Sequence, residues 1–295
     1  MKQKVFSGFQ GAGLGLRRDF LSSFLASESI PVDFLEVAPE NWMKLGGRLG
    51  RAFAEISERY RIVTHGLSLS IGGLQPLDVD FLTDLKVFLQ KFQIEIYSEH
   101  LSYCSDGLGH LYDLMPIPFT EEAVSYVANR IRQVQDILER KLIIENVSYY
   151  GAPSPEMTEI NFLNAVLQEA DCHLLLDVNN IYVNSINHGY DPNDFISAIP
   201  THRIQYIHIA GHYCEAPDLR VDTHGADVID PVWALLSTTY QRHGVYPTLL
   251  ERDFNIPSVE HLLGEIGQIR TAQTIVAQKS ESLAKPERQV VALEI

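Results

Sequence analysis

The chain has 295 residues, of which 45% are hydrophobic, and a formal net charge of −15 at pH 7. This apolar content supports a large core and excludes a disordered chain. The negative charge argues against nucleic acid as the main partner, because an acidic surface repels phosphate backbones. Bound cations would offset part of that charge.

Cysteine usage and the N-terminal stretch bear on the cellular compartment. The cysteines Cys104, Cys172 and Cys214 form no C-x-x-C pair and leave an odd thiol, which favours a reducing environment. Residues 1–13 lack the apolar region of a signal peptide, and no run approaches a transmembrane span. The sequence therefore predicts a soluble cytoplasmic protein without membrane contact. Cys104 and Cys214 follow predicted strands, and both are expected to be small buried hydrophobic residues.

Strand-like apolar runs alternate with helical periodicity along the chain. The first part predicts, in order, a strand at 6–16, a helix at 18–26, a strand at 32–37, a helix at 48–60, a strand at 62–65, a helix at 79–92 and a strand at 94–100. The second part predicts a helix at 120–140, a strand at 142–146, a helix at 159–170, a strand at 173–178, a short helix ending at 198, a strand at 204–209, a helix at 231–243, a strand at 246–251 and a helix at 258–272.

Polar residues mark where several of these helices begin. Thr120 is followed by two glutamates, which is typical of an N-cap with acidic residues in the first helical turn. Asp191 or Asn193 can cap the short helix, and Ser258 the last one.

Eight strand–helix units in a chain of this length predict a (β/α)8 TIM barrel of the α/β class. A doubly wound open sheet is the alternative. It is disfavoured because the glycines of residues 8–15 do not complete G-x-G-x-x-G, with Leu16 in place of the third glycine. Residues 1–275 are expected to form one barrel domain, and residues 276–295 a C-terminal surface tail.

Ionisable residues recur where the predicted strands end. Strands three to eight each carry one at or near the C-terminal end: His65, His100, Glu145, Asp177, His208 and Glu251. In a TIM barrel these ends meet at the functional face. Buried carboxylates are costly unless they are paired or bound to a metal, so core packing does not account for the series.

The loop after the seventh strand adds Asp222 and His224, which can point to the same side of an extended segment. A single histidine at a strand end is more often a hydrogen-bonded core residue. Four imidazoles and four carboxylates together, however, favour a multinuclear site for divalent transition metals. Because one ion rarely needs more than four to six ligands, eight candidates predict two or three ions, bridged by Glu145 or Glu251.

Four other residues are weaker candidates. Asn180 lies three residues beyond Asp177 and is either a carbonyl ligand or a turn residue. His188, His212 and Asn41 lie in expected loops near the mouth and are candidate contacts to substrate.

The order of these candidates resembles that in the metal barrels of the endonuclease IV and xylose isomerase superfamily. Within it, the chain looks like the multinuclear non-heme iron-dependent oxidative enzymes, the family of the iron enzyme of methanobactin biosynthesis. The resemblance covers nearly the whole chain to about residue 270. It is carried by GAGLGLR, FLEVAPENWM, THGLSLSIGG, SEHLSY, IENVS, LLLDVNNIYVN, NHGYD, HIAGH and DTHG.

This resemblance implies a barrel that holds two or three iron ions (Fe2+ or Fe3+), with other divalent metals as alternatives in the purified protein. It implies an oxidoreductase that uses dioxygen to oxidise cysteine residues of a ribosomally made precursor peptide, which a separate partner protein presents. By analogy, one ion would be held by His65, His100 and Glu145, a second by Glu145, Asp177, His208 and Glu251, and a third by Asp222 and His224, with Asn180 as an additional ligand.

Two other functions fit the same barrel. One is a metal-dependent hydrolase or sugar isomerase, for which zinc, magnesium or manganese would be the expected metal. The other is a non-catalytic metal-binding or storage protein, for which full coordination without an open position would be expected. DNA repair is disfavoured because the resembling DNA-repair enzyme would carry a histidine where this chain has Asn180.

Overall fold

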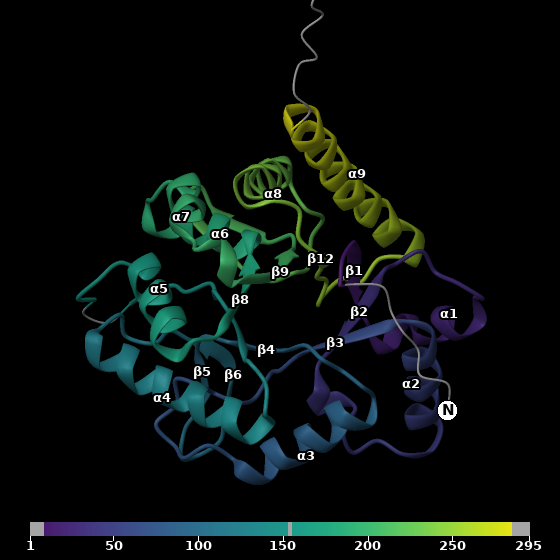
Figure 1. The fold of residues 1–295 in the computed structure, drawn as a ribbon, viewed down its shortest axis with the longest axis horizontal. Coiled ribbons are helices and arrows are strands. Elements are labelled where there is room, and N and C mark those ends of the chain that lie inside the picture. Colours follow the sequence, from purple (N-terminus) through teal and green to yellow (C-terminus); the bar gives the residue numbers. More distant parts are fainter. Residues whose placement is uncertain (1–8, 153–154, 285–295) are drawn as a thin grey trace, which may run out of the picture.

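The computed structural model describes residues 9–152 and 155–284. In these residues eight parallel strands close into a barrel with helices around it (Figure 1). The strands follow around the ring as β1 (Ala12–Gly15), β2 (Phe34–Val37), β3 (Arg61–His65), β4 (Tyr97–His100), β7 (Ile143–Glu145), β8 (His173–Asp177), β9 (Ile204–Ile209) and β12 (Thr248–Leu250). Because β12 pairs with β1, the sheet has no free edge. The predicted (β/α)8 barrel is confirmed and the open doubly wound sheet is excluded.

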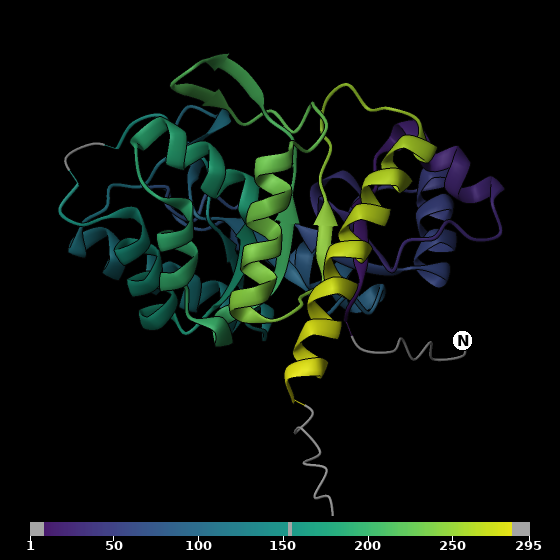
Figure 2. The same cartoon turned by 90° about the horizontal axis from the view of Figure 1, so that it is seen from above.

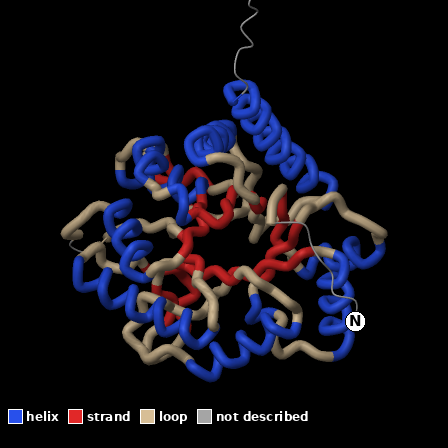
Figure 3. Tube along the Cα trace, in the orientation of Figure 1, coloured by secondary structure: helices blue, strands red, loops and turns tan. Residues whose placement is uncertain are grey.

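The outer layer is helical (Figure 3). Its helices are α1 (Leu21–Ala26), α2 (Gly47–Arg59), α3 (Val79–Lys91), α4 (Glu121–Leu138), α5 (Glu159–Ala170), α6 (Val178–His188), α7 (Pro192–Ala198), α8 (Asp230–His243) and α9 (Val259–Ala284), with 3-10 turns η1 (Arg18–Phe20), η2 (Pro39–Asn41) and η3 (Thr201–Arg203). Most predicted elements occur at the expected places with shifted ends, and residues 6–8 of the first predicted strand lie outside the described residues. No described helix is long and apolar enough to cross a membrane.

The predicted capping residues fix three helix starts. Thr120 accepts a hydrogen bond from the backbone amide of Ala123 at the start of α4. Asp191, rather than Asn193, caps α7. The hydroxyl of Ser258 accepts from the third residue beyond it, at the start of α9. These side chains satisfy amide groups that have no partner within the helix.

Two helices correct the sequence-based expectation. α6 begins directly after β8, where a loop was expected, because Asp177 caps it by accepting from the backbone amide of Asn180 (2.6 Å). α9 continues beyond residue 272, across the start of the expected tail, to Ala284. The chain has no glycine or proline between Gly267 and Pro286 that would end this helix. The rest of the expected tail, 285–295, lies outside the described residues.

Two short hairpins that the sequence analysis did not identify follow strands of the barrel. They are β5 (Tyr103–Ser105) with β6 (His110–Met115), and β10 (Tyr213–Ala216) with β11 (Leu219–Val221). Figure 2 shows β10 and β11 projecting beyond the C-terminal face of the barrel. Both lack the alternation of apolar and polar residues that marks a half-buried strand.

The barrel interior is built in layers. A lower layer is apolar and buried: Phe34, Val63, Ile96, Ile143, Leu175, Tyr206 and Leu249. Two residues further along the chain, each side chain again faces the same side of its strand. These next positions are polar and buried: Glu36, His65, Ser98, Glu145, Asp177, His208 and Glu251. The apolar layer therefore closes the barrel below a polar layer at the C-terminal mouth.

Candidate metal centre

The structure places all eight predicted ligands in one continuous cluster at the mouth of the barrel. Three overlapping groups contain seven of the eight, and neighbouring groups share Glu145 or Glu251. Asp222 joins the third group through its 2.7 Å contact with His224. The convergence follows from parallel pairing, because the C-terminal ends of all the strands lie at the same face of the barrel.

The first group contains His65, His100 and Glu145. The Nε2 atoms of the two histidines are 3.0 Å apart, and each lies 3.4 Å from Oε2 of Glu145. Two donor atoms bound at about 2.1 Å to one ion, at right or tetrahedral angles, would be roughly 3.0–3.4 Å apart. The three atoms are therefore spaced as ligands of a single ion are.

The second group contains Glu145, Asp177, His208 and Glu251, all buried. The Nδ1 atom of His208 lies 3.3 Å from Oε1 of Glu145 and 2.9 Å from Oε2 of Glu251. Glu145 thus turns one carboxylate oxygen toward each group. This is the arrangement that a bridging carboxylate requires.

The third group contains His224, Glu251 and Asp253. Nδ1 of His224 lies 3.5 Å from Oε2 of Glu251 and 3.1 Å from Oδ2 of Asp253, while its Nε2 lies 2.7 Å from Oδ1 of Asp222. The backbone of His224 is left-handed, with φ at 48°, which is uncommon for a residue with a side chain. Asp253 was not predicted, although it lies two residues beyond Glu251 in the sequence.

Two buried oxygen atoms of the cluster, Oδ2 of Asp177 and Oδ1 of Asn180, have no hydrogen-bond partner among the described residues. The ring nitrogens Nδ1 of His208 and Nε2 of His224 face carboxylate oxygens at 2.9 and 2.7 Å. Leaving such oxygen atoms buried without a partner is costly, so native structures rarely contain them in a group. Nitrogen and oxygen lone pairs that point into a shared space are what a bound cation needs. The residues present therefore fit a metal ion.

Electrostatics in the first group are strongly asymmetric. Burial lowers the pKa of His65, but the neighbouring Glu145 carboxylate outweighs burial and raises that pKa to about 9. Burial and the charge on His65 lower the pKa of His100 to about 4. Burial opposes ionisation of Glu145, yet the positive charge of His65 holds the pKa of this carboxyl well below its usual range.

The other groups show the same competition between burial and charge. Burial opposes protonation of His208, but Glu36 and Glu251 raise its pKa well above the usual value. Burial and the Glu145 charge raise the pKa of Asp177. A protein that holds these carboxylates close together gains from any positive charge among them, whether from protonated histidines or from a cation.

Asp177 has two separable roles, since Oδ1 caps α6 while Oδ2 has no partner. We expect Asp177→Asn to keep the cap, because asparagine is an equally good N-cap. Without metal, the Asp177→Asn variant should therefore be closer in free energy of unfolding to the natural protein than a variant that loses the cap. Asp177→Ala should lose about 1 kcal/mol. Urea unfolding of chelator-treated protein measures both, and equal losses in the two variants would contradict the separation of roles.

The weaker candidates are placed as follows. Asn180 lies in the first turn of α6, buried, with its side-chain amide donating to the Asn146 carbonyl. His212 is buried, and its Nδ1 contacts Asn179, whose amide donates to the ligand candidate Asp222. His212 is therefore linked to the cluster through one residue.

The other two candidate substrate contacts are not in the cluster. His188 lies in the last turn of α6 rather than in a loop, stacked on Tyr149 with ring centroids 4.0 Å apart. Asn41 is exposed at the end of η2, and its carbonyl accepts from Arg18. The expectation for the cysteines also needs one correction, because Cys214 is exposed on β10 while Cys104 is buried.

Two further residues near the mouth were missed by sequence reasoning. Glu36 is the polar inner residue of β2, and its Oε2 accepts from His208 Nε2 at 3.1 Å. Glu36 follows the inward-facing Phe34 by two positions, the same spacing from an apolar to a polar residue that the ligand-bearing strands have. Arg17 follows β1, donates to the Arg252 carbonyl and pairs with Asp253. Arg17 ends the segment GAGLGLR, which carries part of the family resemblance, but the sequence assigned it no role.

A fourth group of metal-capable residues, Asp227, His261 and Glu265, shares no residue with this cluster. The guanidinium of Arg252 is 2.7 Å from Asp227 and 3.1 Å from Glu265, and His261 also contacts Asp227. A buried cation of the protein itself therefore already neutralises these carboxylates.

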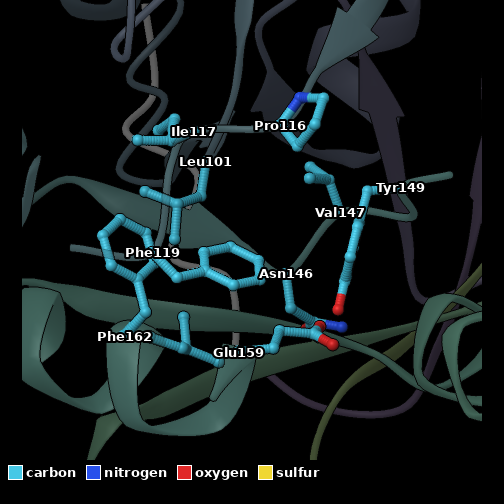
Figure 4. A pocket seen from close by; sticks show the side chains of 10 residues that line it. Leu101, Pro116, Ile117, Phe119, Asn146, Val147, Tyr149, Glu159 and Phe162 are labelled. Atoms are coloured by element: carbon cyan, nitrogen blue, oxygen red, sulfur yellow. The ribbon is translucent and has the colours of Figure 1, made fainter. Parts of the chain in front are cut away.

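An apolar cavity lies beside the cluster, between the segments after β4 and β7 and helix α5 (Figure 4). Leu101, Phe119 and Phe162 line it, and the Glu159 carboxyl enters it. Its volume of about 20 Å³ accommodates roughly one water molecule. Burial raises the pKa of Glu159 to about 7. The cavity is too small to receive an amino-acid side chain.

The fold and the polar mouth define a (β/α)8 barrel of the xylose isomerase-like class. L-ribulose 3-epimerase has this fold, with a TM-score of 0.61 at 14% identity over 95% of this chain and 99% of that chain. A putative xylose isomerase from Rhodospirillum rubrum gives a TM-score of 0.56 at 12% identity over 90% of this chain and 99% of that chain. At these identities the likeness shows the fold alone.

The chain belongs to the family described as RiPP precursor modification enzyme MbnB/TglH/ChrH, whose model matches residues 11–274. Two curated relatives carry the name UPF0276 protein. One from Shewanella loihica is 63% identical over 272 residues, covering 92% of this chain and 98% of that protein. One from Pseudomonas aeruginosa is 55% identical over 263 residues, covering 89% and 92%. The family makes the chain an enzyme that modifies precursors of ribosomally synthesised, post-translationally modified peptides, built on a TIM barrel.

Proposed function

We propose that this protein is a multinuclear non-heme iron enzyme that uses dioxygen to oxidise cysteine residues of a RiPP precursor peptide. The observation that carries the proposal is the cluster of buried imidazole nitrogens and carboxylate oxygens at the mouth, in which Oδ2 of Asp177 and Oδ1 of Asn180 have no partner and Glu145 is shared between two groups. Family membership supports the peptide substrate.

The donor set favours iron among the candidate metals. Imidazole and carboxylate together suit iron, whereas a site of oxygen ligands alone would suit magnesium or calcium. His65, His100 and Glu145 would hold one ion, and Glu145, Asp177, His208 and Glu251 a second. His224 would hold a third with Asp222 or Asp253, and with Asn180 as a weaker ligand. Iron bound there would supply the redox chemistry with dioxygen.

The chain's own residues contribute orientation and charge. Glu145 stays ionised, because the neighbouring histidines lower its pKa, and can serve two ions at once. The low pKa of His100 keeps its imidazole neutral at pH 7 and therefore available as a ligand. The apolar layer beneath the cluster keeps solvent out from below, so a peptide would approach from the C-terminal mouth. A separate partner protein would present that peptide.

The test uses full-length protein loaded with Fe2+ without oxygen, together with a cysteine-containing precursor peptide encoded beside its gene and the corresponding partner protein. We expect dioxygen consumption and a change in peptide mass on exposure to air. A peptide with each cysteine replaced by serine, and protein kept metal-free, should show neither. Absence of peptide-dependent oxygen uptake and mass change would contradict the proposal. Turnover of sugars or phosphoesters with zinc, magnesium or manganese would instead support a metal-dependent hydrolase or isomerase.

A further inference from the structure

We propose that Glu36 is a positioning residue that orients two candidate ligands of different ions, His208 directly and His65 through Tyr206 and Ser98. The inference rests on the proposed metal centre and adds residues to it that no ligand assignment contains. It follows from an unbroken chain of buried hydrogen bonds across the polar layer of the barrel.

The chain of contacts begins at the inner face of β2. Oε2 of Glu36 accepts from the Tyr206 hydroxyl at 2.8 Å and contacts Nε2 of His208 at 3.1 Å. The Tyr206 hydroxyl lies 2.7 Å from Oγ of Ser98, which lies 2.8 Å from Nδ1 of His65. All five residues are buried, with at most 5% of their surface exposed. Water therefore does not compete for these groups.

The direction of each hydrogen bond follows from the number of hydrogens available. The Tyr206 hydroxyl donates to Oε2 of Glu36, and the same carboxylate oxygen accepts from Nε2 of His208. The single hydroxyl hydrogen of Tyr206 is then in use. Ser98 Oγ therefore offers its one hydrogen to the Tyr206 hydroxyl at 2.7 Å, the shorter contact, or to the Thr64 carbonyl at 3.2 Å. The Ser98 hydrogen is thereby in use as well. Its remaining contact requires His65 to donate from Nδ1.

These directions decide which nitrogen of each histidine is free to bind metal. With a hydrogen on Nδ1, His65 has its lone pair on Nε2, which faces His100 and Glu145 at 3.0 and 3.4 Å. With a hydrogen on Nε2, His208 has its lone pair on Nδ1, which faces Glu145 and Glu251. One carboxylate therefore selects opposite tautomers for two ligands, and each free nitrogen points into its own group.

Space filling alone does not account for a glutamate at position 36. A buried carboxylate costs free energy that an apolar side chain of similar volume would not. The layer immediately below is already closed by Phe34 and the Tyr206 ring, which pack against Phe9. The Glu36 carboxylate is therefore best explained by the two hydrogen bonds that it accepts, from Tyr206 and His208.

The experiment compares metal affinity at each ion in three variants of the full-length protein. Tyr206→Phe breaks the link to His65 but leaves the contact between Glu36 and His208. Glu36→Leu removes both links. Tyr97→Phe is the matched control, because this buried tyrosine donates to Glu99 outside the network. Anaerobic competition titration, with Mössbauer spectra of 57Fe-loaded protein to separate the ions, gives each affinity, and circular dichroism checks folding.

We expect Tyr206→Phe to lower the affinity for the ion at His65 about tenfold and to leave the affinity for the ion at His208 unchanged. Glu36→Leu should lower both affinities by about 10- to 100-fold. Tyr97→Phe should match the natural protein. Equal affinities in Tyr206→Phe and the natural protein, or equal losses in Tyr206→Phe and Tyr97→Phe, would overturn the inference. The Tyr206→Phe comparison remains decisive if Glu36→Leu does not fold.

A second measurement reads the tautomers directly. In zinc-loaded protein with 15N-labelled histidine, NMR should find the hydrogen of His65 on Nδ1 and that of His208 on Nε2. The opposite assignment for either residue would also overturn the inference. Natural protein that binds no metal under any loading condition would instead contradict the proposed metal centre itself, so the two failures are distinguishable.

Discussion

Glu145→Gln is expected to lose both of the ions that Glu145 contacts, with affinity at each falling by at least about 100-fold. The carboxylate turns Oε2 toward His65 and His100 and Oε1 toward His208. An amide can offer only one acceptor oxygen and places an NH2 donor toward the other group. Iron per chain after anaerobic loading and desalting measures the effect.

The matched control for this prediction is Glu122→Gln. Glu122 is an exposed residue in the first turn of α4, away from the cluster, and its substitution removes the same charge. This control should keep the full iron content. If Glu145→Gln retained the ion at either group with unchanged affinity, Glu145 would not be a bridge.

Metal loading is expected to rise steeply with pH, because His65 holds a proton up to about pH 9. A metal ion must displace that proton, so the apparent affinity at His65 should increase about tenfold per pH unit below 9, or about 100-fold from pH 7 to 9. Anaerobic Mn2+ titrations across this range measure the slope. His65→Gln should abolish the dependence at this ion, whereas His110→Gln, at an exposed position on β6, should not change it.

The raised pKa of His65 also predicts that the metal-free protein becomes less stable as pH rises. The folded-state pKa of His65 is above the usual value, so its stabilising contribution is complete below pH 6.5 and is lost as pH rises through 9. The loss is on the order of 3 kcal/mol for a shift of this size. Urea unfolding of chelator-treated protein from pH 6.5 to 9 should show the decline. A flat profile would mean that Glu145 does not hold the His65 proton.

The sequence predicted the barrel because its strand and helix patterns are local. Hydrophobic runs such as 142–146 and capping residues such as Thr120 act within a few residues of themselves. Six of the eight candidate ligands were predictable for the same reason, since each stands at or near the end of an apolar run, whereas Asp222 and His224 were read from a D-x-H pair in a loop. Glu36 and Asp253 carried comparable signals: Glu36 lies one residue before the end of β2, and Asp253 lies two residues beyond Glu251.

Other features depend on contacts that are distant in the sequence. The segment after Asp177 was expected to be a loop, and the Asp177 cap produces α6 only when β8 brings the chain to that position. Arg17 reaches Asp253 across the closure between β1 and β12, which no local pattern reveals. Exposure of Cys214 depends on how far the hairpin of β10 and β11 projects from the mouth.

By itself, the sequence determined that the strands exist, that they form a barrel, and which residue types occupy its C-terminal mouth, because periodicity and chain order are enough to specify these. Only the tertiary structure decided which atoms face each other. Closing the ring places Glu145 between two groups of histidines and sets Glu36 of β2 against His208 of β9. The side-chain contacts that assign a bridge and a hydrogen-bond direction arise only when residues far apart in the chain are brought together.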